Sequence, residues 1–554
     1  MIAPPPTTRR EWLAAERGFA PTAKPAGALA VALVYPNAYH LGMSSLGFQM
    51  TYRVINDHPR ARAERFFLDS LAEGSIESGA PLAHFDLIAI SACYEMDAPH
   101  LLETIEAAGL PIEARERGDG ARPLVLLGGV LPEVNRLPYY PFFDLFTHGD
   151  AEVILPGLLD ALADARGRSL ADRLSTVEGL PGVEIADGAR AAAGWPHDER
   201  LLEFGRADLL DRFASPDETP APAPPPARAT LASLDNDLAA TQILTPHTEF
   251  SDMALVDLAR GCPHHCTFCW IGHNTPTFRA RPIERVIAAM ESWRGATDRF
   301  GLVSSAVGAH PEIDDICRWA MARDLRISYS SLRVEEVTPT MLEALARGGQ
   351  KTITIAPETG SERVRRLLGK RIGDEEILDV VARAMELGAE NIKLYMMIGI
   401  PSETDEEALA AAAFAERVRG VMLRWARPRG RMGYVGVNLG VFTPKPNLPL
   451  NHIEPPSPAA LRARLRRVVR ALGRIPNMKL NVGSPELASA QSILSVGGIE
   501  AARYLLMARA ERGDWRAANR RWRRQAEAHH DRRRELGRIP GERLRERARA
   551  LTAP

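Results

Sequence analysis

Short apolar runs alternate with helix-like stretches through the first part of the chain. The runs at residues 28–35 and 85–93 are each followed by a helix-like segment, a third run covers 123–130, and 144–152 adds a short strand, a turn and a helix start. Apolar runs of this length are typical of buried parallel strands, and their alternation with helices favours a doubly wound sheet. Such sheets bind ligands at the carboxyl ends of their strands. The sequence therefore predicts an α/β, Rossmann-like domain with a crevice at that edge.

Length, charge and cysteine content set further limits. At 554 residues the chain is long enough for several domains, and a net charge of −1 gives no global field that favours nucleic acid or a membrane surface. Five cysteines in so long a chain do not make a disulfide framework, which favours a reducing compartment. The first residues lack the apolar core of a signal peptide, and no apolar run approaches the roughly 20 residues of a bilayer span. We therefore expect a cytoplasmic protein without membrane association.

Three of the five cysteines, Cys262, Cys266 and Cys269, stand close together. Their C-x3-C-x2-C spacing lets three thiolates share one metal centre and leaves it one ligand short of a closed four-ligand site. A centre with an open position is typical of catalysis rather than of a structural role. Two alternatives stay open at this point: three unrelated thiols, or a zinc loop completed by a nearby histidine. The histidines in reach are His264, His265 and His273.

This motif, with Phe268 directly before its last cysteine, resembles that of the radical S-adenosylmethionine superfamily. The resemblance implies a 4Fe-4S cluster held by the three cysteines, with its fourth iron free to bind S-adenosylmethionine. It also implies an electron donor such as flavodoxin or ferredoxin. One electron from the cluster would cleave S-adenosylmethionine and yield a 5′-deoxyadenosyl radical.

The same resemblance implies a fold for the second half of the chain. Strand–helix units after the cysteine loop, together with the strand before it, would form a partial (β/α)6 TIM-like barrel with its chemistry at the carboxyl ends of the strands. The strands are expected at residues 253–259, 299–304, 326–331, 351–356, 391–397 and 434–440.

Several of these strand ends carry residues that the family would use for S-adenosylmethionine. Glu358 would hold polar parts such as the ribose, and Lys370 stands where relatives place a basic residue against the methionyl carboxylate. The alternative for this carboxylate and ammonium is a pair that binds no ligand. Ile400 belongs to a fifth-strand motif that packs the adenine. The other expected contacts are Phe268 beside the cluster, and Ser304, Ser305 and Ala306, whose backbone carbonyls would bind the methionyl amino group.

The first half resembles the cobalamin-binding domain that precedes the barrel in many members of this superfamily. The likeness rests on the proline loop after the first strand, on Ile90-Ser91, and on the glycine turns at 127–129 and 149–152. Any one of these small residues could equally serve only a tight strand-to-helix turn. The residues implied as cobalamin contacts are Ser44, Ser91, Gly128, Gly129 and Gly149.

The sequence departs from one cobalamin motif. The pattern D-x-H-x-x-G supplies the lower ligand of cobalt in cobalamin mutases and methionine synthase. Around His40, Ala38 replaces the aspartate and Met43 the glycine. His40 is therefore expected to be an ordinary surface histidine. The proline loop, residues 245–249 and the P-K-P stretch at 444–446 resemble an uncharacterised subgroup of the superfamily.

The chain is expected to divide into five parts, of which the last is helical and rich in arginine. Trp515 and Trp522 stand among those arginines, so this part could contact RNA or simply present a solvated helical face. The parts are an N-terminal extension at 1–27, the cobalamin-binding-like domain at 28–200, a linker with a proline-rich stretch at 201–250, the barrel at 251–484 and the C-terminal region at 485–554.

Three functions stay open on this basis. The first is cobalamin-dependent methyl transfer to an unreactive carbon. The second is radical chemistry without cobalamin on RNA or another substrate that the first domain presents, and the third is a non-enzymatic iron–sulfur redox module. Only Cys93 precedes the motif and only Cys317 follows it, so the thiols allow one cluster and exclude the second cluster of methylthiotransferases. The substrate is not identified by the sequence.

Overall fold

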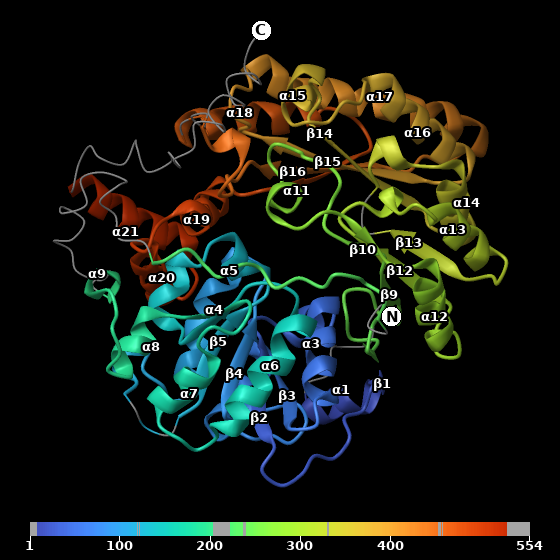
Figure 1. Cartoon of the computed structure of the whole chain (residues 1–554). Helices are drawn as coiled ribbons and strands as arrows, with labels where there is room; N and C mark the ends of the chain where they lie inside the picture. Colours follow the sequence, from blue (N-terminus) through green and yellow to red (C-terminus); the bar gives the residue numbers. More distant parts are fainter. Residues whose placement is uncertain are drawn as a thin grey trace. The chain divides into compact units, whose positions relative to one another are not determined.

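The computed structural model describes residues 8–118, 120, 122–202, 222–236, 240–329, 332–452, 456 and 458–528 (Figure 1). The chain divides into two units. One contains the residues up to Ala232 together with Thr241–Asp252 and a C-terminal stretch that begins at Ala490; the other contains Ser233–Ala240 and Met253–Ser489. No helix in the described ranges has the length and apolar content to cross a membrane.

The first unit is built on a six-stranded sheet with the order β3-β2-β4-β5-β6-β7. The strands from β2 to β6 run parallel, and β7 is antiparallel to β6. In this flavodoxin-type order the chain reverses its direction of travel between β2 and β4, which is where such sheets bind ligands. The strands are β2 (Leu29–Tyr35), β3 (Ala61–Phe67), β4 (Leu87–Ser91), β5 (Leu124–Gly128), β6 (Leu145–Thr147) and β7 (Val183–Ile185).

Both faces of this sheet are buried, because alternate residues of each strand point to opposite sides. All seven residues of β2 are buried. Val31 and Leu33 join a core formed with α3 (Leu46–Asp57) and α6 (Ala151–Asp164), whereas Ala32 and Val34 join a second core formed with α4 (Ala98–Ala107). The remaining helices of this half are α1 (Arg9–Ala15), α2 (Tyr39–Gly42), α5 (Val130–Val134), α7 (Leu170–Val177), α8 (Asp187–Ala192) and α9 (Glu199–Leu202).

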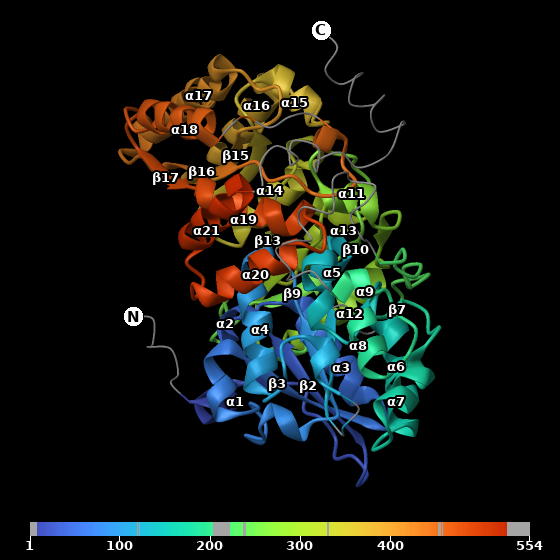
Figure 2. The same ribbon diagram turned by 90° about the vertical axis from the view of Figure 1, so that its left-hand side faces the viewer.

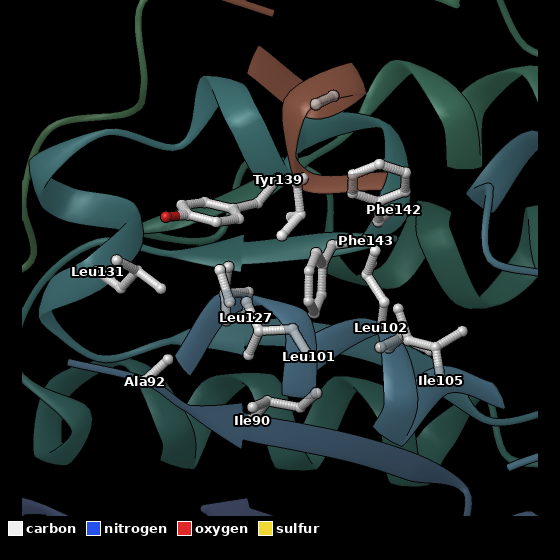
Figure 3. Close-up of a cluster of buried hydrophobic side chains, with 14 of the residues drawn as sticks. Ile90, Ala92, Leu101, Leu102, Ile105, Leu127, Leu131, Tyr139, Phe142 and Phe143 are labelled. Atoms are coloured by element: carbon white, nitrogen blue, oxygen red, sulfur yellow. The ribbon is translucent and has the colours of Figure 1, made fainter. Parts of the chain in front are cut away.

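Helices from the far end of the sequence complete the second core. α20 (Ala501–Ala510) contributes the fully buried Tyr504 and Leu505, and it packs against α4. Figure 3 shows this core, with sheet residues such as Ile90 and Leu127 facing residues of α4 and the brown-red C-terminal segment above them. The helical pattern at 485–554 predicts a separate region, but α4 alone leaves this apolar face uncovered, and the stretch from Ala490 is part of the first unit.

The two tryptophans of the C-terminal region are buried. Trp515 and Trp522 lie on α21 (Trp515–Ala528), each is 9% exposed, and their rings contact that of Tyr504. They are therefore core residues and not a stacking surface for RNA bases. The arginine cluster at 531–535 and most of the proline-rich stretch at 215–227 lie outside the described residues.

The second unit is an open barrel of parallel strands. One sheet has the order β13-β12-β9 and the other β14-β15-β16-β17, and a parallel bridge between Leu332 and Ile355 joins them. The six predicted strands are present, and the predicted fold class is confirmed. β17 is an additional strand that the sequence analysis missed, because its residues are mostly exposed at the sheet edge. The strands are β9 (Ala254–Asp257), β12 (Arg299–Val303), β13 (Arg326–Tyr329), β14 (Thr352–Glu358), β15 (Asn391–Ile398), β16 (Val435–Val441) and β17 (Met478–Val482).

Helices cover one side of these strands, as is clear for α16 to α18 over β15 and β16 in both views (Figures 1 and 2). The pattern of β15 explains why: Ile392 and Leu394 are buried toward the helices, whereas Tyr395 is 40% exposed on the other side. α17 (Asp405–Arg429) begins with a capping box, in which the Thr404 side chain and Glu407 satisfy each other's backbone amides. The other helices are α12 (Ile283–Trp293), α13 (Ile313–Met321), α14 (Pro339–Arg347), α15 (Glu362–Leu367), α16 (Asp374–Glu386) and α18 (Pro458–Leu472).

Candidate active site

The three cysteines lie in the loop that follows β9, at the carboxyl end of the barrel strands. The short strand β10 (Ala259–Arg260) leads into this loop, and α11 (Trp270–Asn274) begins directly after Cys269. The loop is pinned to the end of α15, because the amide of Thr267 donates to the Leu368 carbonyl at 3.1 Å and its hydroxyl to the Leu367 carbonyl at 2.9 Å. The chain therefore holds the cysteine loop in place without help from a bound ligand.

Cys266 is buried, whereas Cys262 and Cys269 are half-buried. Burial raises the pKa of the Cys262 thiol, and the nearby Cys269 and Cys266 raise it further. That mutual influence places the three sulfurs within electrostatic reach of one another. Within the described residues, no three His, Cys, Asp or Glu side chains converge as ligands of one metal ion. A 4Fe-4S cluster binds each thiolate through a different iron, so its ligands do not need to meet at one point.

The histidines of the loop are engaged elsewhere. His264 contacts the carboxylate of Glu336, and His273 Nε2 lies 3.1 Å from the Cys266 carbonyl oxygen. The rings of His265 and His273 contact each other edge-on. These contacts favour an all-thiol donor set, which is the set that iron–sulfur clusters use.

Buried polar atoms without a partner gather around the loop. Trp270 Nε1, Arg333 Nε and Glu336 Oε2 are all buried and have no hydrogen-bond partner among the described residues. Such atoms are rare in folded proteins and call for an explanation such as a ligand. Two donors and one acceptor beside three thiols fit a polar, sulfur-rich group, so the donor set here fits a cluster with its bound cosubstrate.

Two of the residues expected to contact S-adenosylmethionine lie in one apolar cluster. Phe268 packs against a buried cluster that contains Ile400, and Met397 packs against the same cluster. The other members are Val364, Leu367, Leu368, Phe442 and Leu450. Two residues predicted from motifs 132 positions apart therefore lie on one apolar surface beside the cysteine loop.

Glu358 and Lys370 form a pair at the end of β14. Lys370 Nζ donates to Glu358 Oε1 at 2.6 Å and to the Ala356 carbonyl at 2.5 Å, and Lys370 is 3% exposed. Glu358 has φ of +66°, a conformation that costs free energy for a residue with a side chain. The structure thus ties the predicted ammonium to the predicted carboxylate, so Lys370 orients Glu358.

Ser304, Ser305 and Ala306 form the loop after β12, next to β9 in the sheet. Ser304 Oγ accepts a hydrogen bond from the Ala306 amide at 3.2 Å, and Ala306 is buried. Just beyond them, Gly308 lies so close to Glu336 that a Cβ there would be 2.5 Å from the Glu336 Cβ. This loop and the segment after β13 therefore pack together at the same edge as the cysteines.

In the first unit, close contacts with neighbouring protein atoms explain why glycine stands at the predicted positions. A Cβ on Gly129 would lie 2.4 Å from the Ala92 carbonyl oxygen, and one on Gly149 would lie 2.0 Å from that of Ala229. A Cβ on Gly128 would meet the hydroxyl of Thr147 at 2.7 Å. Close backbone approach therefore requires glycine here whether or not a ligand binds.

Two predicted serines and the histidine lie in neighbouring loops. Ser44 Oγ donates to the His40 carbonyl at 2.6 Å and accepts from the Glu249 amide at 2.9 Å. His40 itself is exposed and pairs with the Glu249 carboxylate, which matches the expectation of a surface histidine. Ser91 ends β4 and is half-buried.

The surface beside the switch point of the first sheet also carries polar residues other than the predicted serines and glycines. Tyr35, at the end of β2, has its hydroxyl 3.4 Å from Cys93 Sγ, and Tyr94 is 45% exposed. Asn37 donates to Asp97 at 2.7 Å and ties the loops after β2 and β4 together. Only the parallel pairing of β2 with β4 brings these residues together.

Two residues near the barrel edge were also missed. Arg333 lies on the loop after β13 and contacts Cys266, and Glu403, in the fifth-strand motif, is 6% exposed. Burial raises the pKa of Glu403 to about 7, although the Gly399 amide and Arg464 oppose the shift. An isolated arginine or glutamate in a sequence gives no signal of such burial.

Comparison with known proteins supports the assignment of both units. Residues 47–185 match the family described as the N-terminal region of radical SAM proteins, and residues 256–415 match the radical SAM superfamily. An uncharacterised protein of Methanocaldococcus jannaschii is 25% identical over 379 residues, which are 68% of this chain and 71% of that protein.

Other relatives match over shorter regions. The tRNA-2-methylthio-N(6)-dimethylallyladenosine synthase of Staphylococcus epidermidis is 25% identical over 168 residues, and the match covers 28% of this chain and only 32% of that protein. Among solved structures, the radical S-adenosylmethionine methyltransferase TsrM of Kitasatospora setae, with cobalamin and a 4Fe-4S cluster bound, is similar with a TM-score of 0.50 and 16% identity. That similarity covers 76% of this chain and 77% of TsrM, and it shows a shared fold.

The matched families and the cysteine loop at the barrel edge lead to one conclusion. The chain belongs to the radical S-adenosylmethionine superfamily and is an enzyme whose cofactors include a 4Fe-4S cluster and S-adenosylmethionine.

Proposed function

We propose that this enzyme is a cobalamin-dependent methyltransferase that adds a methyl group to an unreactive carbon. The observation that carries the proposal is the extent of the likeness to TsrM. A match over 76% of the chain must include parts of both units, since neither unit alone is that long. TsrM binds both cobalamin and a 4Fe-4S cluster, and the first unit here has the strand order of a ligand-binding doubly wound sheet.

In the barrel, Cys262, Cys266 and Cys269 would hold the cluster. When bound, the cluster supplies the electron that cleaves S-adenosylmethionine. The apolar surface with Phe268 and Ile400 suits the adenine ring. These roles are assigned from the chemistry of the side chains and from their common position at the strand ends.

The polar groups of S-adenosylmethionine need both hydrogen-bond donors and hydrogen-bond acceptors from the protein. Glu358, held by Lys370, offers a carboxylate to ribose hydroxyls. The backbone of the loop Ser304–Ala306 offers carbonyl oxygens to the methionyl amino group, and Trp270 Nε1 is a free donor at the cysteine loop. The ribose hydroxyls, the methionyl amino group and the methionyl carboxylate would thus each have a partner of matching hydrogen-bond character.

In the first unit, we assign the corrinoid to the surface at the switch point. Cobalamin bound there supplies a transferable methyl group. Tyr35, Cys93 and Tyr94 line the carboxyl ends of β2 and β4, and both Cys93 and Tyr94 are exposed. Gly128, Gly129 and Gly149 would shape the strand ends beside this surface, and Ser44 and Ser91 would offer hydroxyls.

Methylthio transfer, the activity of the Staphylococcus epidermidis relative, is a weaker candidate. A methylthiotransferase carries a second cluster on three further cysteines, and Cys93 is the only cysteine before residue 262. The region shared with that relative also covers only 32% of its length.

The proposal is tested by anaerobic reconstitution of the cluster, followed by absorbance spectra with and without added cobalamin. A corrinoid spectrum at one equivalent per chain after desalting supports it, and no bound corrinoid under saturating cobalamin refutes it. Cys93→Trp should block corrinoid binding while the iron content stays full. Ser175→Trp, an exposed position on α7, is the matched control and should leave binding unchanged.

A further inference from the structure

The guanidinium of Arg333 lies against one cysteine of the loop. Arg333 Nη1 donates to Cys266 Sγ at 3.3 Å, and Nη2 donates to Glu335 at 2.9 Å. Arg333 Nε is buried and has no partner among the described residues. The side chain is 13% exposed and Cys266 is 4% exposed, so this contact is largely shielded from water.

The surrounding chain fixes Arg333 from two sides. It directly precedes the 3-10 turn Val334–Glu336, whose last residue contacts His264 of the cysteine loop. On the other side, Gly308 fits against Glu336 with no space for a side chain. The arginine is therefore held between the loops after β9 and β12, and its position does not depend on its own salt bridge.

A simple ion pair does not account for this arrangement. Glu335 uses only Nη2, and its side chain is 27% exposed, so the pair could form equally well in solvent. Nη1 donates to Cys266, and Nε, on another edge of the guanidinium, is buried without a partner among the described residues. A buried cation that donates to a thiol sulfur matches a sulfur-rich, negatively charged group.

We propose that Arg333 is a positioning residue that sets the reduction potential of the 4Fe-4S cluster through Cys266. Reduction takes one electron from an external one-electron donor and adds one negative charge to the cluster, with no bond broken and no proton transferred. A fixed cation that donates to a ligand sulfur stabilises the more negative, reduced form and raises the potential. The low local dielectric strengthens this effect. The inference goes beyond the proposed function, since it holds whether or not cobalamin binds.

The test compares midpoint potentials of reconstituted, full-length variants, measured by redox titration with electron paramagnetic resonance of the reduced cluster. Arg333→Met should lower the reduced-to-oxidised ratio at a fixed potential about tenfold, which equals about 59 mV for one electron. Arg333→Lys keeps the charge but loses the forked donors, so its decrease should be smaller. Arg347→Met, on an exposed arginine of α14, should leave the midpoint unchanged.

Glu335→Gln provides an effect of opposite sign, because it removes a carboxylate that opposes the guanidinium charge, and it should raise the midpoint. Iron and sulfide content are measured for every variant. Arg333→Met with full iron and an unchanged midpoint overturns the proposal. If that variant loses iron, Arg333→Lys with full iron and an unchanged midpoint overturns it instead.

Discussion

In both units, small and polar residues follow the carboxyl ends of the parallel strands, but these two regions differ in how the structure packs them. In the first unit, the backbone of Ala92 packs directly on Gly129 and that of Ala229 on Gly149, in the space that a side chain would need. The chain itself therefore occupies the space beside these glycines. At the barrel edge, Trp270, Arg333 and Glu336 carry buried polar atoms that no described residue satisfies. The close packing explains the glycines without a ligand, whereas the unpaired atoms beside the three cysteines call for a partner. Buried atoms without a described partner also occur in the first unit, on Tyr139 and Arg228. The comparison therefore locates the chemistry at the barrel more firmly than at the glycine turns.

The largest effect is expected at the cysteines. Cys266→Ala removes a cluster ligand, and cleavage of S-adenosylmethionine to 5′-deoxyadenosine should fall to the background. Cys317→Ala is the matched control, because that thiol is buried on α13 against the Tyr329 hydroxyl at 3.0 Å and has no role at the strand ends. Cleavage is measured by chromatography after anaerobic reconstitution. Undiminished cleavage by Cys266→Ala would refute the assignment of the cluster.

The next effect concerns the C-terminal helices that complete the first unit. Leu505 is fully buried in the core with α4, so Leu505→Ala should lower the free energy of unfolding by about 2–5 kcal/mol. Leu506→Ala, a neighbour that is only partly buried, should cost clearly less. Urea unfolding followed by circular dichroism measures both. Equal, small losses would show that α20 is not part of this core.

Gly149→Ala directly tests the close backbone packing at the glycine turns of the first unit. Its φ of +133° and the 2.0 Å approach to the Ala229 carbonyl should make this change cost about 2–4 kcal/mol. Gly157→Ala is the control: this glycine lies inside α6 with open space around it, and alanine there should stabilise the helix by up to about 1 kcal/mol. Thermal unfolding without cofactors separates the two, and a neutral Gly149→Ala would contradict the packing explanation.

The smallest effect is expected at Glu403, as a dependence on pH. Burial raises the pKa of this carboxyl to about 7 from its ordinary value of 4.5. The folded protein therefore binds more protons than the unfolded chain between these values, so this contribution to stability is fully present below pH 4.5 and is lost as the pH rises to 7. The loss amounts to at most about 3.4 kcal/mol.

Glu403→Gln should remove this contribution to the fall of the free energy of unfolding with rising pH. Glu407, in the first turn of α17, offers a contrast, because hydrogen bonds from Arg363 lower its pKa to about 2. Its contribution is present above pH 4.5 and is lost only as the pH falls toward 2. Glu407→Gln should therefore change the slope of stability between pH 5 and 7 much less than Glu403→Gln, through the small lowering of the Glu403 pKa that follows from removing the Glu407 charge. Melting temperatures of the three proteins across pH 5–8 measure this difference. Parallel curves for the parent and Glu403→Gln would contradict it.

Much of the fold could be predicted because the signals were local. Fully apolar runs such as 28–35 indicated buried strands, and strand–helix alternation indicated parallel sheets. β17 was missed because an exposed edge strand carries no apolar run. The place of α20 and α21 was missed because a helix pattern shows that an apolar face exists but not which surface it covers.

The cluster chemistry could be inferred from the amino-acid sequence, because the spacing of Cys262, Cys266 and Cys269 allows one cluster and the scarcity of other cysteines allows no second one. Which groups surround that cluster became clear from the fold. Arg333 approaches Cys266 from a segment 67 residues away, and Lys370 is bound to Glu358 rather than free. The physical reason is that ligand spacing within a loop is encoded locally, whereas burial and hydrogen-bond satisfaction arise from parallel strands that bring distant loops to one edge.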